Sequence, residues 1–325
     1  MLWCLKNHKN MDISVVIPLL NEKESLRELT DSILDVMKSY NFSYEIIFID
    51  DGSFDNSWDI IEELSSKSDT IKGIKFHRNY GKSQALHAGF LKSQGKVVFT
   101  MDADLQDDPK EIPAMYDMIM NDNFDLVSGW KKKRFDSVIF KNIPSKIFNF
   151  AAKTTSGIKL NDFNCGLKAF KKDVIKSINV YGEMHRYIPI LAKNEGYKKI
   201  GEKIVNHRPR KYGKTKFGPS RFLYGFLDLL TIWFISSFGK RPMHLFGSLG
   251  LILITTGFLF AAYLGYDKII LNPGGRLITE RPEFYISLVT MIIGSQFFSM
   301  GFIGELMLKS INQKPQYIIQ KQTNL

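Results

Sequence analysis

Residues 97–106 read VVFTMDADLQ, an apolar run of strand character that ends in two aspartates separated by one residue. The run is short, rich in β-branched and aromatic side chains and uncharged until Asp102, which is typical of a buried strand. Two carboxylates at the end of a strand can share a hard divalent cation, because Mg²⁺ prefers oxygen ligands. An Asp-rich turn gives the same triplet, so the surrounding sequence must decide between the two interpretations.

Four further runs of strand character flank this stretch, at residues 14–18, 45–49, 71–76 and 125–127. Amphipathic segments such as 24–40 and 57–66 separate them. Alternation of strands and helices predicts a mostly parallel sheet with helices on both faces. We therefore predict an α/β domain over residues 11–220, preceded by an extension of residues 1–10 to which no function is assigned.

Polar and charged residues follow each predicted strand directly. In open α/β sheets, ligands bind outside the carboxyl ends of the strands, so these loops are predicted to converge on one edge of the sheet. Taken singly, each loop has a bland explanation: Asp51-Gly52 is a common turn pair, and Arg78 and Lys82 suit a solvated basic surface. The residues concerned are Pro18, Asn21 and Glu22, then Asp50 and Asp51, then Asn79 and Lys82, then Asp102, Asp104 and Gln106, and finally Arg134.

Composition limits the classes of function. The chain has 325 residues, a formal net charge of +11 and two cysteines. The low cysteine count excludes a disulfide framework and a cysteine-rich metal site. The positive charge suits nucleic acid, a phosphorylated molecule or an anionic membrane surface. The first ten residues lack the apolar core of a signal peptide, so we expect the α/β domain to be cytoplasmic.

Two long uncharged segments follow the α/β domain. Residues 243–266 and 284–304 contain no Asp, Glu, Lys or Arg over 24 and 21 residues. Each can cross a hydrocarbon layer of about 30 Å, which predicts two transmembrane helices within residues 242–308. A pair of buried core helices is the alternative.

The flanks of these segments suggest how the chain meets the membrane. Residues 222–238 are apolar but interrupted by Asp228, which predicts an interfacial helix within residues 221–241. A third span is the alternative. Basic residues on both outer flanks favour a cytoplasmic start and a cytoplasmic tail over residues 309–325, although the connecting loop is also basic. The predicted location is the inner membrane of the cell, with the chain crossing it more than once.

Together, the motifs resemble family-2 glycosyltransferases of the GT-A fold, a Rossmann-like α/β fold. The runs SVVIPLLNEKESL (14–26), FIDDGSFDNS (48–57), HRNYGKSQALHAGF (77–90) and MDADLQDDP (101–109) carry this resemblance. The runs SGWKKKRFDS (128–137), DFNCGLKAF (162–170) and HRPRKYGKTKFG (207–218) are similar to the polyprenyl-phosphate branch. That branch includes dolichyl-phosphate mannose synthases and bactoprenol glucosyltransferases.

The resemblance implies roles for individual residues. Lys168 departs from the family pattern, because many relatives have Arg there and Lys lacks the bidentate fork. The implied nucleotide-sugar-binding residues are Pro18, Asn21, Glu22, Asp50, Asp51, Asn79, Lys82, Asp102 and Ala103. The implied ligands of Mg²⁺ or Mn²⁺ are Asp102, Asp104 and Gln106. Arg134 and Lys168 fall where family members carry cations near the acceptor phosphate. The charge of Arg186, and of Arg208, Arg210 and Lys216 in the basic run before the predicted interfacial helix, suits the same phosphate. The alternatives are a helix-capping or packing role for Arg186 and a simple membrane-surface patch for the basic run. The implied catalytic residues are Asp104, Asp162, Arg134 and Lys168.

The reaction implied by the resemblance is inverting transfer of a hexose, with UDP-glucose as the first expected donor, to undecaprenyl phosphate at the cytoplasmic membrane face. A phosphate monoester is mostly dianionic at neutral pH and needs no general base. Relatives that use hydroxyl acceptors usually carry a Glu-Asp or Thr-Asp pair, whereas Glu183 here has no Asp after it. GDP-mannose, UDP-N-acetylhexosamines, a hydroxyl acceptor and a homo-oligomer all stay open.

Three other functions compete with this interpretation. A processive polysaccharide synthase of the same fold would carry a Gln-x-x-Arg-Trp motif, which the sequence lacks. A basic membrane protein that binds nucleic acid would not need paired acids at successive strand ends, so no nucleic-acid partner is predicted. A nicotinamide dehydrogenase is disfavoured because Gly-x-Gly-x-x-Gly does not follow the first strand.

Overall fold

The computed structural model describes residues 11–132, 149, 152–154, 156–180, 182, 184–209, 211–212, 234, 238, 241–310 and 319–324. The chain forms two compact units. The first comprises residues 1–233 together with 315–325, and the second comprises residues 234–314. The structure of each unit follows separately.

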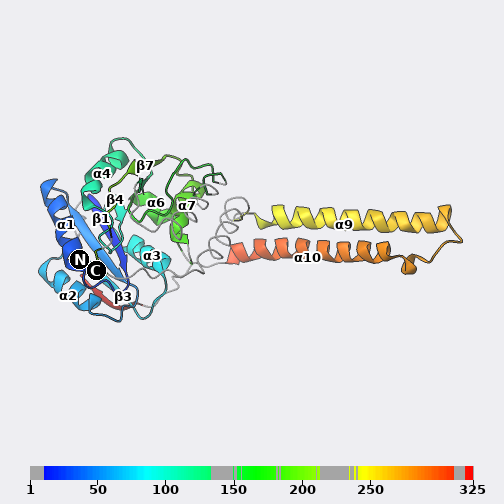
Figure 1. Ribbon diagram of the computed structural model, residues 1–325, viewed down its shortest axis with the longest axis horizontal. Helices are drawn as coiled ribbons and strands as arrows, with labels where there is room; N and C mark the ends of the chain where they lie inside the picture. The colour runs from blue at the N-terminus through cyan, green and yellow to red at the C-terminus, as the bar shows by residue number, and fades with distance from the viewer. Residues whose placement is uncertain are drawn as a thin grey trace, which may run out of the picture. The chain divides into compact units, whose positions relative to one another are not determined.

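The first unit is built on an eight-stranded sheet with the order β7-β5-β6-β4-β1-β2-β3-β8 (Figure 1). Strands β1 to β5 and β7 share one direction, whereas β6 and β8 run antiparallel to their neighbours. The prediction of a mostly parallel sheet is confirmed. The strand bounds are β1 Ile13–Leu19, β2 Tyr44–Asp50, β3 Ile71–Phe76, β4 Val97–Thr100, β5 Leu126–Trp130, β6 Lys168–Lys171, β7 Ile200–Ile204 and β8 Ile319–Thr323.

Helices cover both faces of the sheet, with α1, α2 and α4 on one side and α3 and α6 on the other in Figure 1. The amphipathic segments predicted from residues 24 and 57 onward are α1 and α2. The helix bounds are α1 Leu26–Ser39, α2 Ser57–Lys67, α3 Lys82–Lys92, α4 Ile112–Met120, α6 Lys172–Ser177 and α7 Ile188–Asn194. Two 3₁₀ turns, η1 Pro109–Glu111 and η3 Met184–Tyr187, precede α4 and α7.

Successive residues of a strand point to opposite faces of the sheet and pack into the two hydrophobic layers. On β1, Val15 and Ile17 belong to the main core, together with Leu29 of α1 and Trp58 of α2. Val16 points to the opposite face, where a Cβ on Gly89 of α3 would lie 2.4 Å from its Cγ1 atom. Burying each such aliphatic side chain contributes about 1.5–3 kcal/mol. The sheet is therefore sandwiched, and its carboxyl edge carries the loops at which ligands bind in such folds.

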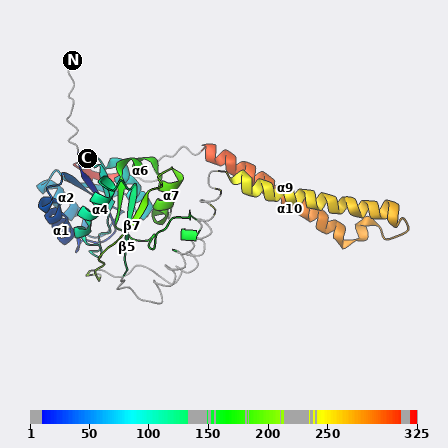
Figure 2. The same ribbon diagram turned by 90° about the horizontal axis from the view of Figure 1, so that it is seen from above.

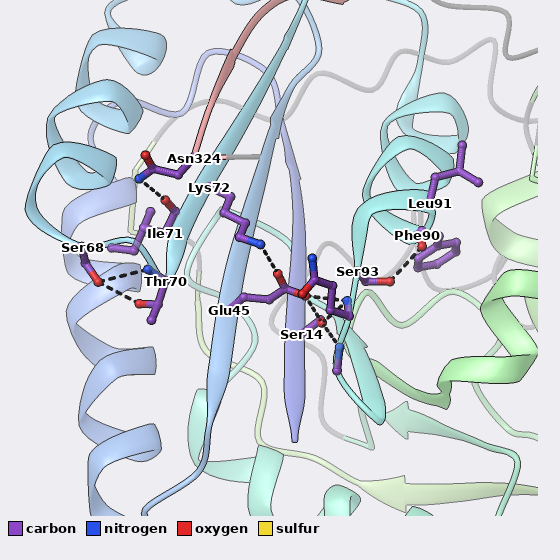
Figure 3. A network of polar contacts seen from close by, with 12 residues as sticks. Ser14, Glu45, Ser68, Thr70, Ile71, Lys72, Phe90, Leu91, Ser93 and Asn324 are labelled. Carbon is purple, nitrogen blue, oxygen red and sulfur yellow. Dashed lines mark hydrogen bonds and ion pairs between the residues drawn. The ribbon is translucent and has the colours of Figure 1, made fainter. Parts of the chain in front are cut away.

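A buried polar network ties the amino ends of the central strands together (Figure 3). The carboxylate of Glu45, which is fully buried, accepts a hydrogen bond from Ser14 Oγ at 2.5 Å and pairs with Lys72 Nζ at 2.8 Å. The backbone N–H of Gln94 also donates to Glu45, at 2.6 Å. A buried carboxylate needs such partners, because an uncompensated one costs several kcal/mol. The network joins β1, β2 and β3 at the edge opposite the predicted site.

The second unit is a pair of long apolar helices, α9 Pro242–Tyr266 and α10 Pro282–Ser310, that lie side by side in Figures 1 and 2. The π-helical turn η4 Asp267–Leu271 extends α9, and η5 Ile278–Glu280 precedes α10. Both helices are long and apolar enough to cross a membrane, over Pro242–Leu271 and Pro282–Met307. Only 17% of each apolar window is buried, which argues against the alternative of core helices. In the segment predicted to contain the interfacial helix, residues 221–241, the structure describes only Phe234, Phe238 and Arg241.

The last described segment returns to the first unit. Strand β8 pairs antiparallel with β3, with Thr323 opposite Gly73 and Ile319 opposite Phe76. The side chain of Asn324 donates to the Ser65 carbonyl oxygen at 2.7 Å. Residues 309–325 were predicted only to be a tail, without a strand, and β8 covers an otherwise open sheet edge.

Candidate active site

The loops after β2 and β3 are joined through Asp51. Its carboxylate accepts hydrogen bonds from the backbone N–H groups of Tyr80 at 2.7 Å and Gly81 at 2.9 Å. Gly52 has φ +77°, and a Cβ there would lie 2.5 Å from the carbonyl carbon of Arg78. Burial raises the pKa of Asp51 to about 6, although the two backbone hydrogen bonds oppose this rise. Asp51 thus holds the turn that starts α3, where Asn79 is exposed and Lys82 begins the helix.

Asp50, the neighbour of Asp51, has one carboxylate oxygen that accepts no hydrogen bond from the described residues. Its side chain is buried, and Oδ1 accepts a hydrogen bond from the backbone N–H of Ser53 at 2.8 Å. The Oδ2 atom has no hydrogen-bond partner among the described residues. Burial raises the pKa of this carboxyl. A buried acceptor without a protein partner is rare in folded proteins, and this oxygen can accept a hydrogen bond from water or a ligand.

Asn21 connects the loops after β1 and β2. It adopts φ 52°, a conformation that Asn tolerates better than most residues. Its backbone N–H donates to Ser53 Oγ and its side-chain oxygen accepts from the Phe54 N–H, both at 2.8 Å. The neighbouring Glu22 N–H donates to Ser57 Oγ at 3.1 Å. Pro18 lies within β1 beside this loop, so the polar residues predicted to follow the first two strands do meet.

Asp102 lies at the end of β4 among several ammonium groups. Its Oδ1 atom lies 2.5 Å from Lys82 Nζ, at the start of α3. Burial favours the neutral acid, but the charges of Lys82, Lys131 and Lys168 outweigh it and lower the pKa of Asp102. The carboxylate is therefore ionised throughout the physiological pH range.

The residues after Asp102 form a tight loop with a strained backbone. Leu105 has φ 61°, which is unusual for a residue with a bulky side chain. Asp104 is buried and its Oδ1 accepts from the Gln106 N–H at 3.2 Å, while Ala103 packs into the core. Strain of this kind clusters at functional sites. The loop carries two acids, Asp102 and Asp104, at the carboxyl edge of the sheet.

The donor set of this loop fits a hard divalent cation. The described residues contain no cluster of three or more His, Cys, Asp or Glu side chains that could enclose a metal ion. Two carboxylates, Asp102 and Asp104, together with the oxygen of Gln106, leave coordination positions for the oxygens of a bound ligand. Mg²⁺ is usually held in this way, by one or two carboxylates and substrate phosphates.

Lys168 lies close enough to Asp162 and to Asp102 for their charges to interact. Lys168 is buried on β6 and its ammonium group donates to the Cys165 carbonyl oxygen. Burial lowers the pKa of Lys168 and raises that of the Cys165 thiol to about 12, so the thiol is unreactive at neutral pH. Asp162 is buried, and its Oδ1 accepts from the Asn164 N–H at 3.0 Å.

The predicted phosphate-binding residues are only partly described. Arg186 is half-buried in η3, next to His185, whose Nδ1 lies 3.2 Å from Ser83 Oγ. Arg208 is half exposed and pairs with Asp108 at 2.6 Å, which the sequence did not suggest. Arg134, Arg210 and Lys216 lie outside the described residues.

Lys131 and Asp107 form a buried ion pair and are not among the predicted site residues. Lys131 Nζ lies 2.8 Å from Asp107 Oδ1, with 12% and 0% of the two side chains exposed. Burial disfavours the ammonium form, but the Asp107 carboxylate prevails and raises the pKa of Lys131. Lys131 directly follows β5, at a strand end where the sequence predicts polar residues of the site, but its pairing with Asp107 was not predicted.

Comparison with known proteins places this geometry in a family. The family model "Glycosyl transferase family 2" matches residues 14–178. Dodecaprenyl-phosphate galacturonate synthase of Rhizobium johnstonii is 34% identical over 96% of this chain and 93% of its own length. Undecaprenyl-phosphate 4-deoxy-4-formamido-L-arabinose transferase of Shewanella sediminis is 33% identical over 97% and 94%.

Solved structures share the fold. Glucosyl-3-phosphoglycerate synthase from Mycobacterium tuberculosis, in complex with UDP, is 19% identical with a TM-score of 0.54, covering 69% of this chain and 80% of its own. Its complex with Mn²⁺, UDP-glucose and phosphoglyceric acid has a TM-score of 0.52 at 18% identity, covering 70% and 80%. The predicted GT-A fold is confirmed. With the family model covering half of the chain and the relatives nearly all of it, the chain belongs to glycosyl transferase family 2.

Proposed function

We propose that this protein transfers a sugar from a UDP-sugar to a polyprenyl phosphate at the cytoplasmic face of the inner membrane. The observation that carries the proposal is the joint presence of two features. Acidic and basic side chains converge at the carboxyl edge of the sheet, around Asp102. The similarity to two polyprenyl-phosphate sugar transferases also extends across the apolar helices, over 96% and 97% of the chain.

Several UDP-sugars are candidate donors. UDP-glucose was the first expectation from resemblance. The relatives are named for galacturonate and 4-deoxy-4-formamido-L-arabinose, which makes UDP-linked forms of these two sugars equally important donors to test. The proposed nucleotide-binding group comprises Pro18, Asn21, Glu22, Asp50, Asp51, Asn79, Lys82, Asp102 and Ala103.

Asp102 and Asp104, with Gln106, would hold Mg²⁺ or Mn²⁺. When bound, the metal ion would neutralise charge on the diphosphate leaving group. Lys82 would contact the same diphosphate. The 2.5 Å distance between its ammonium group and the Asp102 carboxylate supports this proposed role. The metal ion and Lys82 would both stabilise negative charge on the diphosphate, and neither role requires a proton transfer.

The acceptor requires cations rather than a base. A lipid phosphate is mostly dianionic near neutral pH, so its oxygen can attack without losing a proton. The proposed acceptor-binding residues are Arg134, Lys168, Arg186, Arg208, Arg210 and Lys216, with Asp162 near the reacting centre. Arg208 would have to exchange the Asp108 carboxylate for the lipid phosphate, which its half-exposed position allows.

The return of the chain to its first unit supports the membrane topology. Strands β1–β7 precede the apolar helices, β8 follows them, and all eight strands belong to one sheet. A chain that leaves a folded unit, crosses a bilayer and rejoins that unit must cross an even number of times. Two spans meet this rule and a third full span at residues 222–238 would break it, which favours the interfacial helix.

The test is nucleotide release by the purified full chain with Mg²⁺ or Mn²⁺. The panel would contain UDP-glucose, UDP-galacturonate, UDP-4-deoxy-4-formamido-L-arabinose, UDP-N-acetylglucosamine and GDP-mannose, with and without undecaprenyl phosphate. Release that needs both one donor and the lipid would support the proposal and name the sugar. UDP binding by folded protein without lipid-dependent release from any donor would instead favour a hydroxyl acceptor.

A further inference from the structure

Gly166 lies unusually close to the Asp102 carboxylate. A Cβ atom at position 166 would lie 2.5 Å from Asp102 Oδ2, 2.6 Å from Cγ and 3.0 Å from Oδ1. The carboxylate therefore fills the space that a side chain at residue 166 would need. The φ angle of Gly166 is not in the left-handed region, so space rather than backbone conformation requires glycine here.

The Gly166 backbone is itself held in place. Its carbonyl oxygen accepts a hydrogen bond from Thr100 Oγ1 at 2.8 Å. Thr100 is the last residue of β4 and pairs in register with Lys168 of β6. Because β6 pairs antiparallel with β4, the Gly166 peptide packs against Asp102, which lies two positions after Thr100.

The opposite constraint on Asp102 comes from α3. Lys82 Nζ lies 2.5 Å from Oδ1, while Gly166 lies along the whole carboxylate. A carboxylate confined on both sides has little rotational freedom. Metal ligands held in this way are pre-oriented, and loss of such support commonly weakens metal binding.

We infer that Gly166 is a positioning residue, which sets the direction of the Asp102 carboxylate for a divalent cation and the nucleotide diphosphate. This inference rests on the proposed metal site, and it adds a residue that is not among the predicted site residues. An alanine at position 166 must displace Asp102, because an approach of 2.5 Å is sterically forbidden.

The experiment measures UDP binding to the full-length protein in detergent as a function of Mn²⁺ concentration, with calorimetry as the readout. Gly166→Ala is expected to need about 10–100-fold more Mn²⁺ for the same gain in UDP affinity. Gly201→Ala is the matched control, since its Cβ would crowd the Phe124 ring at 2.7 Å, away from Asp102.

The outcomes separate the inference from the proposed function. If the wild-type protein shows no Mn²⁺-dependent UDP binding, the proposed metal site itself fails. If the wild type shows it and Gly166→Ala matches the wild type, or Gly201→Ala shifts equally, the positioning role is overturned. Should Gly166→Ala not fold, Thr100→Val removes the 2.8 Å hydrogen bond to Gly166 with little change of shape. It should then raise the Mn²⁺ requirement, and an unchanged requirement would overturn the inference.

Discussion

Lys131 and Asp107 form an ion pair that is almost completely removed from water, with Nζ 2.8 Å from Oδ1. Asp107 is two residues beyond the strained Leu105, and Lys131 also interacts with the Asp102 charge. The pair fixes the outer end of the loop that carries Asp102 and Asp104.

Asp107→Asn should destabilise the first unit by about 3–5 kcal/mol, because it leaves the Lys131 ammonium buried without its partner. The measurement is chemical unfolding followed by tryptophan fluorescence. The double variant Asp107→Asn with Lys131→Met removes both charges and should regain part of the loss. A single variant as stable as the wild type would contradict this account of the pair.

Asp104→Asn should abolish sugar transfer while leaving the protein folded and membrane-bound. The substitution preserves shape but removes one of two anionic oxygen ligands from the proposed metal site. Lipid-dependent nucleotide release measures the effect, with Asp117→Asn on α4 as a control away from the site. Activity retained by Asp104→Asn would count strongly against the assigned metal ligands.

UDP binding should weaken as the pH falls below about 6, because Asp51 is then protonated. The protonated acid accepts less strongly from Tyr80 and Gly81, which loosens the turn before α3. The pKa is raised above its usual 3.8, so the folded protein holds this proton more tightly than the unfolded chain does. Ionisation of Asp51 therefore costs stability as the pH rises from about 4 to about 6.

The matched variant for this pH effect is Asp51→Asn, which cannot ionise. Its UDP affinity should be low and should lack the inflection near pH 6. Calorimetric titrations across that range give both curves. Persistence of the same inflection in Asp51→Asn would assign it to another group.

Gly250→Leu should separate the two apolar helices. A Cβ on Gly250 of α9 would lie 2.6 Å from the Gly294 carbonyl oxygen of α10, so the helices touch at their backbones. Small residues at such contacts allow close packing between membrane helices. Gly265→Leu is the control, because nothing lies within 4 Å of a Cβ there. Thermal stability in detergent should fall for Gly250→Leu alone, and equal losses would remove the packing explanation.

Labelling of introduced cysteines should place the two ends of the α9–α10 pair on one side of the membrane. In a Cys4→Ser background, Gly274→Cys between the helices should react with a membrane-impermeant maleimide in intact cells. Lys92→Cys on the α/β unit should react only after lysis, and Asn324→Cys should behave like Lys92→Cys. Labelling of Asn324→Cys from outside would mean an odd number of spans.

Much of the fold could be predicted from local pattern. The run 71–76 is β3 with the predicted bounds, and residues 243–266 lie within α9. These segments carry their structure in their own periodicity and apolarity. The short strands β6, β7 and β8 were missed, since residues 168–171 read KAFK and residues 319–323 read IQKQT. Neither run is apolar, and each becomes a strand because a neighbouring edge accepts it.

Some residues of the candidate site could be predicted from the sequence, whereas one of its ion pairs could not. Asp50, Asp51, Asp102 and Asp104 could be singled out because each follows a predicted strand. The pairing of Arg208 with Asp108 could not, because the two residues lie 100 positions apart and charge alone does not choose a partner.

The sequence by itself determined the parallel α/β core, the two apolar helices and the polar residues at the strand ends, because each depends on side chains close together in the chain. Only the tertiary structure decided that β6 enters antiparallel between β4 and β5 and that β8 closes the sheet after the apolar helices. It also decided that Lys131 pairs with Asp107 and that Gly166 presses on Asp102. Those contacts join distant segments, and the packing of the whole unit selects them from many pairs of equal local preference.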